Sequence, residues 1–150
     1  MPIARNRDHR AARVAAQDAR QYNIGAAARL TGVSAKMIRH YEDIGLLPRV
    51  ERTASGYRLY GEADLHRLRF VRRARSLGFS IKDIGALLGL WDDPRRASRD
   101  VKRLAQAQID DLERRIAEMQ SMQRTLRELA RRCHGDTRPE CPVLDDLAGV

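Results

Sequence analysis

Hydrophobic residues between positions 22 and 46 come in short runs, and each run is ended by a glycine. The run "NIGAAARLTGV" predicts a short helix that Asn23 caps and Gly32 ends. The next run, "AKMIRHYEDI", follows Ser34 as a second N-cap and stops at Gly45. Two short helices joined by a Thr-Gly-Val-Ser turn are typical of a helix-turn-helix.

The pattern changes after residue 46. The segment "LLPRVERTASGYRLYG" predicts two short strands around a Ser-Gly turn, in which Gly56 tolerates a positive φ. Residues 62–77 then carry hydrophobic positions at helical spacing, and "SIKDIGALLGLW" begins with a Ser-x-x-Asp capping box. Residues 22–91 are therefore predicted to be mainly α, a winged helix-turn-helix with a small β-hairpin as its wing.

One long helix is predicted over residues 94–132, because the Asp93–Pro94 pair has the form of an N-cap followed by a first-turn proline. Its seam positions are separated by alternating steps of four and three residues, which is the heptad pattern of a coiled coil. Such a seam needs a second helix to cover it, so we expect a homodimer in which the polar Gln123 helps to fix the register. The seam consists of Ala105, Ile109, Leu112, Ile116, Met119, Gln123, Leu126 and Ala130, and the next heptad position is Cys133.

Charge is distributed unevenly along the chain. The formal net charge is +3 for residues 1–21, +6 for residues 22–91 and zero for residues 92–150, which sum to +9. Positive charge over the predicted winged domain favours a polyanionic partner such as DNA. Residues 1–21 have no sustained hydrophobic face, and they are predicted to be a basic, mobile N-terminal arm. No hydrophobic run approaches the roughly 20 residues of a membrane span, so we expect a soluble, cytoplasmic protein with no membrane partner.

The only two cysteines, Cys133 and Cys141, have seven residues between them and lie just beyond the long helix. Gly135 and Pro139 end that helix, so the loop between the cysteines could bring two thiolates face to face. Thiolates suit copper(I), its heavier congeners and zinc. A two-coordinate site for a soft monovalent ion is the favoured interpretation. The alternatives are a zinc site completed by His134 and a partner-chain ligand, a thiol–disulfide switch, or two inert cysteines.

Residues 133–150 are thus predicted to form a metal-binding loop followed by a short C-terminal helix, "PVLDDLA". Val143, Leu144 and Leu147 of this helix could cover the loop and exclude water, or could simply pack the C-terminus. The sequence contains no nucleophile elbow, phosphate loop or paired acid–base set, so we do not expect an enzyme. A thiol-based metallochaperone is the alternative from another class, although a helix-turn-helix would have no use in it.

Several segments resemble the MerR family of transcriptional regulators, namely "YNIGAAARLTGVSAKMIRHYEDIGLL", "SGYRLY" and "RARSLGFSIKDIGALL". The tail "CHGDTRPECP" followed by "LAG" resembles the copper-efflux regulator branch, and the likeness covers residues 22–149. The resemblance implies a homodimer with two winged heads and an antiparallel coiled coil, whose paired cysteines bind copper(I), silver(I) or gold(I). It also implies activation of metal-efflux genes, by distorting an over-long spacer in double-stranded promoter DNA so that RNA polymerase engages both promoter elements.

The same resemblance assigns roles to individual residues. Ser98 stands where the family's sensors of divalent ions place a cysteine, which implies selectivity for monovalent ions. A redox- or zinc-responsive regulator on the same scaffold is the alternative within the family. Arg72, Arg73 and Arg75 are expected to be solvated surface. The DNA-binding residues implied by the resemblance are Lys36, Arg39 and Tyr41 on the recognition helix, and Arg52, Tyr57 and Arg58 on the wing. For Tyr41 and Tyr57, packing in the core is the alternative.

Overall fold

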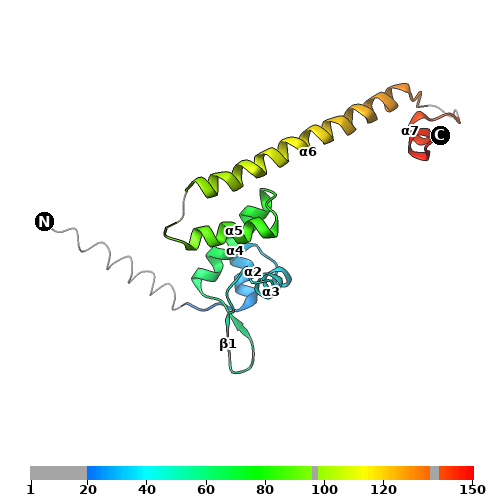
Figure 1. Cartoon of the computed structure of the whole chain (residues 1–150). Coiled ribbons are helices and arrows are strands. Elements are labelled where there is room, and N and C mark those ends of the chain that lie inside the picture. The colour runs from blue at the N-terminus through cyan, green and yellow to red at the C-terminus, as the bar shows by residue number, and fades with distance from the viewer. Residues whose placement is uncertain (1–19, 96–97, 136–138) are drawn as a thin grey trace. The chain divides into compact units, whose positions relative to one another are not determined.

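The computed structural model describes residues 20–95, 98–135 and 139–150. The chain divides into two compact units, residues 1–101 and 102–150. The described part is mainly helical and holds one two-stranded antiparallel sheet, which confirms the predicted fold class (Figure 1). Nearly all of the predicted N-terminal arm, residues 1–19, lies outside the described residues, so the prediction of its mobility stays untested.

The first unit begins with the two helices predicted from the glycine spacing, α2 (Ile24–Thr31) and α3 (Ala35–Asp43). The side chain of Asn23 accepts a hydrogen bond from the Ala26 N–H at 2.8 Å, and that of Ser34 accepts one from the Met37 N–H at 3.2 Å. Both predicted caps are therefore confirmed. Gly32 follows α2 with a φ of 71°, a left-handed conformation that favours glycine.

The wing and two further helices complete the first unit. Strand β1 (Glu51–Arg52) pairs antiparallel with β2 (Arg58–Leu59), and the hairpin projects away from the helices (Figure 1). Helix α4 (Glu62–Ser76) and helix α5 (Ile81–Asp92) follow, with the side chain of Ser80 accepting from the Asp83 N–H at 3.1 Å. The strands are only two residues long, shorter than the predicted wing, because most of this segment bends around its turn.

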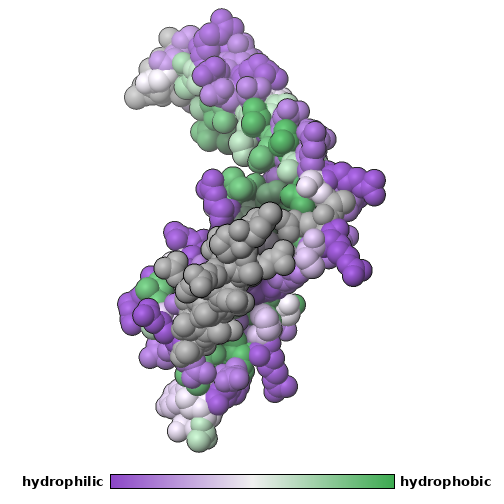
Figure 2. All heavy atoms as spheres, turned by 90° about the vertical axis from the view of Figure 1, so that its left-hand side faces the viewer, coloured by the Kyte–Doolittle hydropathy of each residue, from purple (hydrophilic) through white to green (hydrophobic). Residues whose placement is uncertain are grey.

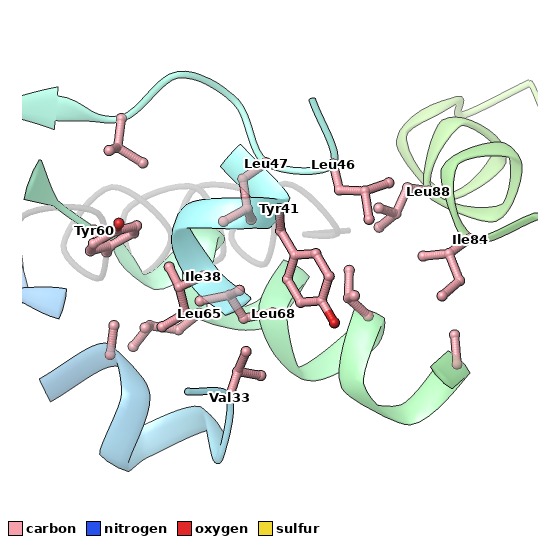
Figure 3. Close-up of a cluster of buried hydrophobic side chains, with 14 residues drawn as sticks. Val33, Ile38, Tyr41, Leu46, Leu47, Tyr60, Leu65, Leu68, Ile84 and Leu88 are labelled. Carbon is pink, nitrogen blue, oxygen red and sulfur yellow. The ribbon is translucent and has the colours of Figure 1, made fainter. Parts of the chain in front are cut away.

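One hydrophobic core holds the helices and the base of the wing together (Figure 3). Burial of each large aliphatic side chain contributes about 1.5–3 kcal/mol to folding, so this core fixes the positions of α3 and the wing relative to each other. Its fully buried large side chains are Ile38 from α3, Tyr60 next to β2, Leu65, Leu68 and Val71 from α4, and Ile84 and Leu88 from α5.

The long helix α6 spans Ser98–Arg132, and a short helix, α7 (Pro142–Ala148), follows the cysteine loop. Helix α6 begins at Ser98 rather than at residue 94. Pro94 and Arg95 lie in a turn, where the side chain of Asp93 accepts a hydrogen bond from the Arg95 N–H at 2.8 Å instead of capping α6. Among the helices of the described ranges, none is long and apolar enough to cross a membrane.

Candidate functional site

Helix α3 presents a basic outer face, because Ile38 and Tyr41 lie on its buried face. Ile38 is fully buried, whereas Lys36 and Arg39 are exposed. Within the described part of the chain, neither cation has a hydrogen-bond or ion-pair partner, so both charges are available to an external anion. This face has the properties of a recognition helix, where basic side chains can reach phosphates and base edges.

The wing carries its own exposed groups. Gly56 turns the hairpin with a φ of 84°, as predicted, and the Arg52 guanidinium donates to the Gly56 carbonyl oxygen at 3.1 Å. The Tyr57 side chain is 71% exposed. Arg52 and Tyr57 therefore lie on the surface, as a role in binding a large partner requires.

Tyr41 departs from the role that the resemblance assigned to it. Its side chain is only 3% exposed and its ring lies within the core, pointing away from the outer face of α3 (Figure 3). The hydroxyl oxygen accepts a hydrogen bond from Arg75 at 3.3 Å. Tyr41 is three residues after Ile38, so helical periodicity places both on the buried face. We therefore assign Tyr41 to packing and not to DNA contact.

Arg58 is engaged inside the protein. Its Nε lies 2.8 Å from a carboxylate oxygen of Glu42, and its terminal nitrogen lies 4.0 Å from a carboxylate oxygen of Asp43. The side chain of Arg58 is 21% exposed and that of Glu42 is 8% exposed. Arg58 therefore links the wing to the last turn of α3, and its charge is largely balanced by that helix.

The hydroxyl of Tyr60 lies in the same electrostatic environment. It is fully buried and, among the described residues, makes no hydrogen bond. Burial raises the pKa of this hydroxyl, and the negative charge of Glu42 raises it further. Tyr60 is therefore neutral and serves as an anchor at the base of the wing.

Arginines of α4 have structural roles that the sequence did not predict. Arg72 donates to the Thr31 carbonyl oxygen at 3.2 Å, and Arg75 donates to the Tyr41 hydroxyl. A side chain at Gly32 would collide with the Arg72 guanidinium. Arg72 thus binds the C-terminal end of α2, where cations are favoured by exposed carbonyl groups. Arg72 and Arg75 are exposed, as expected, and each also makes a hydrogen bond within the first unit.

The two cysteines mark the ends of two helices. The Cys133 N–H donates to the carbonyl oxygens of Leu129 and Ala130 in the last turn of α6, and the Cys141 carbonyl accepts from the Asp145 N–H at 2.9 Å in α7. Both thiols are free and half-buried. Residues 136–138 of the loop lie outside the described ranges, so the fit of a metal is judged from the chemistry of the donors. Two half-buried thiols are soft donors, which suit a soft ion.

Other groups add little to this donor set. The His134 side chain is exposed. Across the parts of the chain that the structure describes, no group of three or more His, Cys, Asp or Glu residues is arranged to hold a metal ion. Of the three residues that could cover the loop or pack the C-terminus, Val143 is half-buried but Leu144 and Leu147 are exposed. These two leucines are therefore not packed against other described residues of the single chain.

Helix α6 exposes much of its hydrophobic seam. Hydrophobic patches stand among hydrophilic side chains in the upper part of Figure 2. Ion pairs flank the seam, with Arg115 2.7 Å from Asp111 and Arg132 3.7 Å from Glu128. Such exposed pairs stabilise the helix by only a few tenths of a kcal/mol each. They do not cover the hydrophobic seam, which needs another packing partner. The large hydrophobic seam residues exposed in the single chain are Ile109, Leu112, Ile116, Met119 and Leu126.

Comparisons with known proteins agree with this geometry. A family model described as MerR HTH family regulatory protein matches residues 22–90, and another described as MerR, DNA binding, matches residues 65–129. The HTH-type transcriptional regulator HmrR of Sinorhizobium medicae is 57% identical over 126 residues, which cover 84% of this chain and 86% of that protein. The HTH-type transcriptional regulator CueR of Salmonella typhimurium is 42% identical over 127 residues, which cover 85% and 92%.

A similar fold is found among solved structures. The crystal structure of the transcription regulator PbrR691 from Ralstonia metallidurans CH34, in complex with lead(II), matches with a TM-score of 0.73 and 33% sequence identity. The match covers 84% of this chain and 98% of that one.

Proposed function

This chain belongs to the MerR family of helix-turn-helix transcriptional regulators, and we propose that it is a dimeric activator that responds to copper(I). The family consists of DNA-binding regulators and not of enzymes, which confirms the prediction made from the absence of a catalytic constellation. The observation that carries the copper proposal is the pair of free, half-buried thiols that bound the loop between α6 and α7.

The choice of copper(I), with silver(I) and gold(I) as congeners, follows from ligand number and softness. Two thiolates suit a soft monovalent ion, whereas zinc in proteins is almost always bound by four ligands. Ser98, the residue that the family resemblance links to metal choice, is exposed at the start of α6 and offers a hydroxyl in place of a third thiolate. The 42% identity to a regulator named CueR supports the same assignment, while the lead(II) complex of PbrR691 keeps a divalent ion as the competing possibility.

Activation would use the two parts of the chain in sequence. We propose that two copies pair through the seam of α6, so that two basic heads bind both halves of a promoter spacer. Metal binding at Cys133 and Cys141 would then favour a distorted form of the DNA that RNA polymerase engages. The exposed cations of α3 and the uncovered seam of α6 support the DNA contact and the dimer respectively.

The proposal is tested by titrating copper(I) against DNA protection and transcription. A redox sensor would instead respond to oxidant without metal, and a metallochaperone would protect no specific DNA sequence. Sequence-specific protection combined with copper-dependent transcription from the protected promoter would support the proposal. Sequence-specific protection with no copper response would overturn the metal assignment alone.

Arg39→Ala is expected to weaken binding to the protected promoter by about 1–3 kcal/mol if Arg39 reads a base. The loss should be nearly uniform across DNA sequences if Arg39 contacts phosphate. Dissociation constants on the protected duplex and on a scrambled duplex distinguish these results. Lys102→Ala, which removes an exposed cation from α6, is the matched control. Unchanged affinity of Arg39→Ala at moderate salt would contradict the assignment of α3 as the recognition helix.

Ser98→Cys is expected to open a response to at least one divalent ion, because a third thiolate would join each proposed site across the dimer. The native protein should not respond to zinc, cadmium or mercury(II) at concentrations where copper(I) activates it. Reporter transcription with each metal, in the native protein and in Ser98→Cys, checks both statements. Ser98→Ala is the control, and it should keep the native metal preference. A strong zinc response of the native protein would contradict the copper assignment.

A further inference from the structure

The geometry points to the Glu42–Arg58 ion pair as a latch that holds the wing at a fixed angle to the recognition helix. We propose that Arg58 supports DNA binding as a positioning residue acting through Glu42, and not as a phosphate contact. This inference rests on the proposed function, because it concerns how the head presents α3 and the wing to promoter DNA. It replaces the role of Arg58 that the family resemblance implied.

The wing has little structure of its own to set its direction. Its strands are joined by only two residue pairs, Glu51 with Leu59 and Arg52 with Arg58. An isolated two-stranded hairpin is at best marginally stable in water, so its orientation depends on contacts with the rest of the head. Tyr60 anchors the base of the wing in the core. Arg58 ties the strand itself, with its Nε 2.8 Å from the Glu42 carboxylate.

Glu42 needs this partner. Its side chain is 8% exposed, and a carboxylate so far removed from water requires a compensating charge. It also lies in the last turn of α3, where the helix dipole disfavours negative charge. The positive charge of Arg58 compensates both the burial of this carboxylate and the unfavourable helix dipole, through a charge-assisted hydrogen bond. The wing and α3 are therefore expected to move as one body.

The same geometry makes Arg58 a poor phosphate ligand. Its guanidinium lies between Glu42 and Asp43, at 2.8 Å and 4.0 Å, and its side chain is 21% exposed. A phosphate group would have to compete with carboxylates already in place. Lys36 and Arg39 carry no such acidic partner within the described residues, and they are exposed. The cations that face DNA and the cation that shapes the head are thus different residues.

The two roles of Arg58 predict opposite effects of Glu42→Gln. If Arg58 binds phosphate, removing a neighbouring negative charge frees it, and affinity for DNA should rise. If Arg58 is a latch, the same substitution releases the wing, and affinity should fall. We expect a fall of about threefold to tenfold, the range for loss of one hydrogen bond. Asp43→Asn removes an equal charge one residue along, from a side chain that is 69% exposed, and should leave affinity unchanged or slightly raised.

The salt dependence of DNA affinity distinguishes a phosphate contact from a positioning role of Arg58, because only the loss of a phosphate contact changes it. Losing one phosphate contact lowers the slope of log affinity against log salt by about 0.9. Arg58→Gln should therefore weaken binding while keeping the native slope, whereas Arg39→Gln, if that residue meets phosphate, should reduce it. The probe is a duplex selected by the native protein from a random DNA pool. Thermal unfolding of each variant, measured alongside, reports whether its head is folded.

Exchange of the two charges completes the test. Glu42→Arg combined with Arg58→Glu should recover part of the affinity that each single substitution loses. If Glu42→Gln unfolds the head, Glu42→Asp keeps the charge but withdraws it by one methylene, and weaker binding is again expected. Tighter binding by Glu42→Gln, or a flattened salt slope for Arg58→Gln, would overturn the latch. Failure of the native protein to select any duplex would instead overturn the proposed function.

Discussion

Serine at either Cys133 or Cys141 is expected to abolish metal-induced transcription while binding to promoter DNA stays at its native level. A two-ligand site that loses one thiolate keeps a single soft donor, and a serine hydroxyl remains protonated and binds copper(I) poorly. DNA affinity should survive because both thiols belong to the second unit, residues 102–150, whereas the exposed cations of α3 belong to the first.

Reporter transcription and DNA-binding affinity, each measured with and without copper(I), check this expectation. His134→Ala is the matched control, since His134 is exposed and adjacent to Cys133 but is not a proposed ligand. Its response to copper should equal that of the native protein. A full copper response from either serine variant would rule out the two-thiolate site. The disulfide and inert-cysteine interpretations would then be favoured.

Replacing Leu112 and Ile116 in the seam of α6 by glutamate is expected to convert the proposed dimer into a monomer. Leu112 and Ile116 are exposed in the single chain, and burial of such a side chain contributes about 1.5–3 kcal/mol. Leu112 is 40% and Ile116 is 54% exposed before pairing, so a dimer would bury about half of each side chain. Replacing both by Glu affects four side chains in a dimer, so the expected loss is roughly 3–6 kcal/mol. Charges placed in an apolar seam add a desolvation cost in the same direction.

Sedimentation equilibrium at several protein concentrations measures this change directly. Ala107→Glu adds a negative charge to an exposed position of the same helix outside the seam, and it should leave the dimer intact. DNA binding should weaken strongly in the monomer, because two heads that bind adjacent half-sites gain from being linked. A Leu112→Glu/Ile116→Glu variant that stays dimeric would show that α6 is not the pairing surface.

Local signals predicted the first unit well. The caps at Asn23 and Ser34 and the glycine at the wing turn follow from chemistry that acts over a few residues, and each is found where it was predicted. The start of α6 was misplaced because an Asp-Pro pair fits a turn as well as a helix start. Only the tertiary context separates these possibilities.

The partners of long charged side chains were not predictable in the same way. Arg58 and Glu42 are 16 residues apart, and Arg72 reaches a carbonyl 41 residues away. Such contacts depend on how elements pack, which no local pattern encodes. Tyr41 is different, since its spacing from Ile38 placed it on the buried face. The family resemblance outweighed that signal.

The separation between residues that face outward and residues that support the head has a consequence for evolution. The side chains of Lys36 and Arg39 are exposed and make no hydrogen bond or ion pair among the described residues, whereas those of Glu42, Arg58 and Arg72 hold elements of the first unit together. Surface substitutions away from structural contacts usually change stability by less than about 0.5 kcal/mol. New operator preferences can therefore be selected at positions 36 and 39 without compensating mutations, which makes this head an adaptable scaffold for reprogrammed promoter recognition.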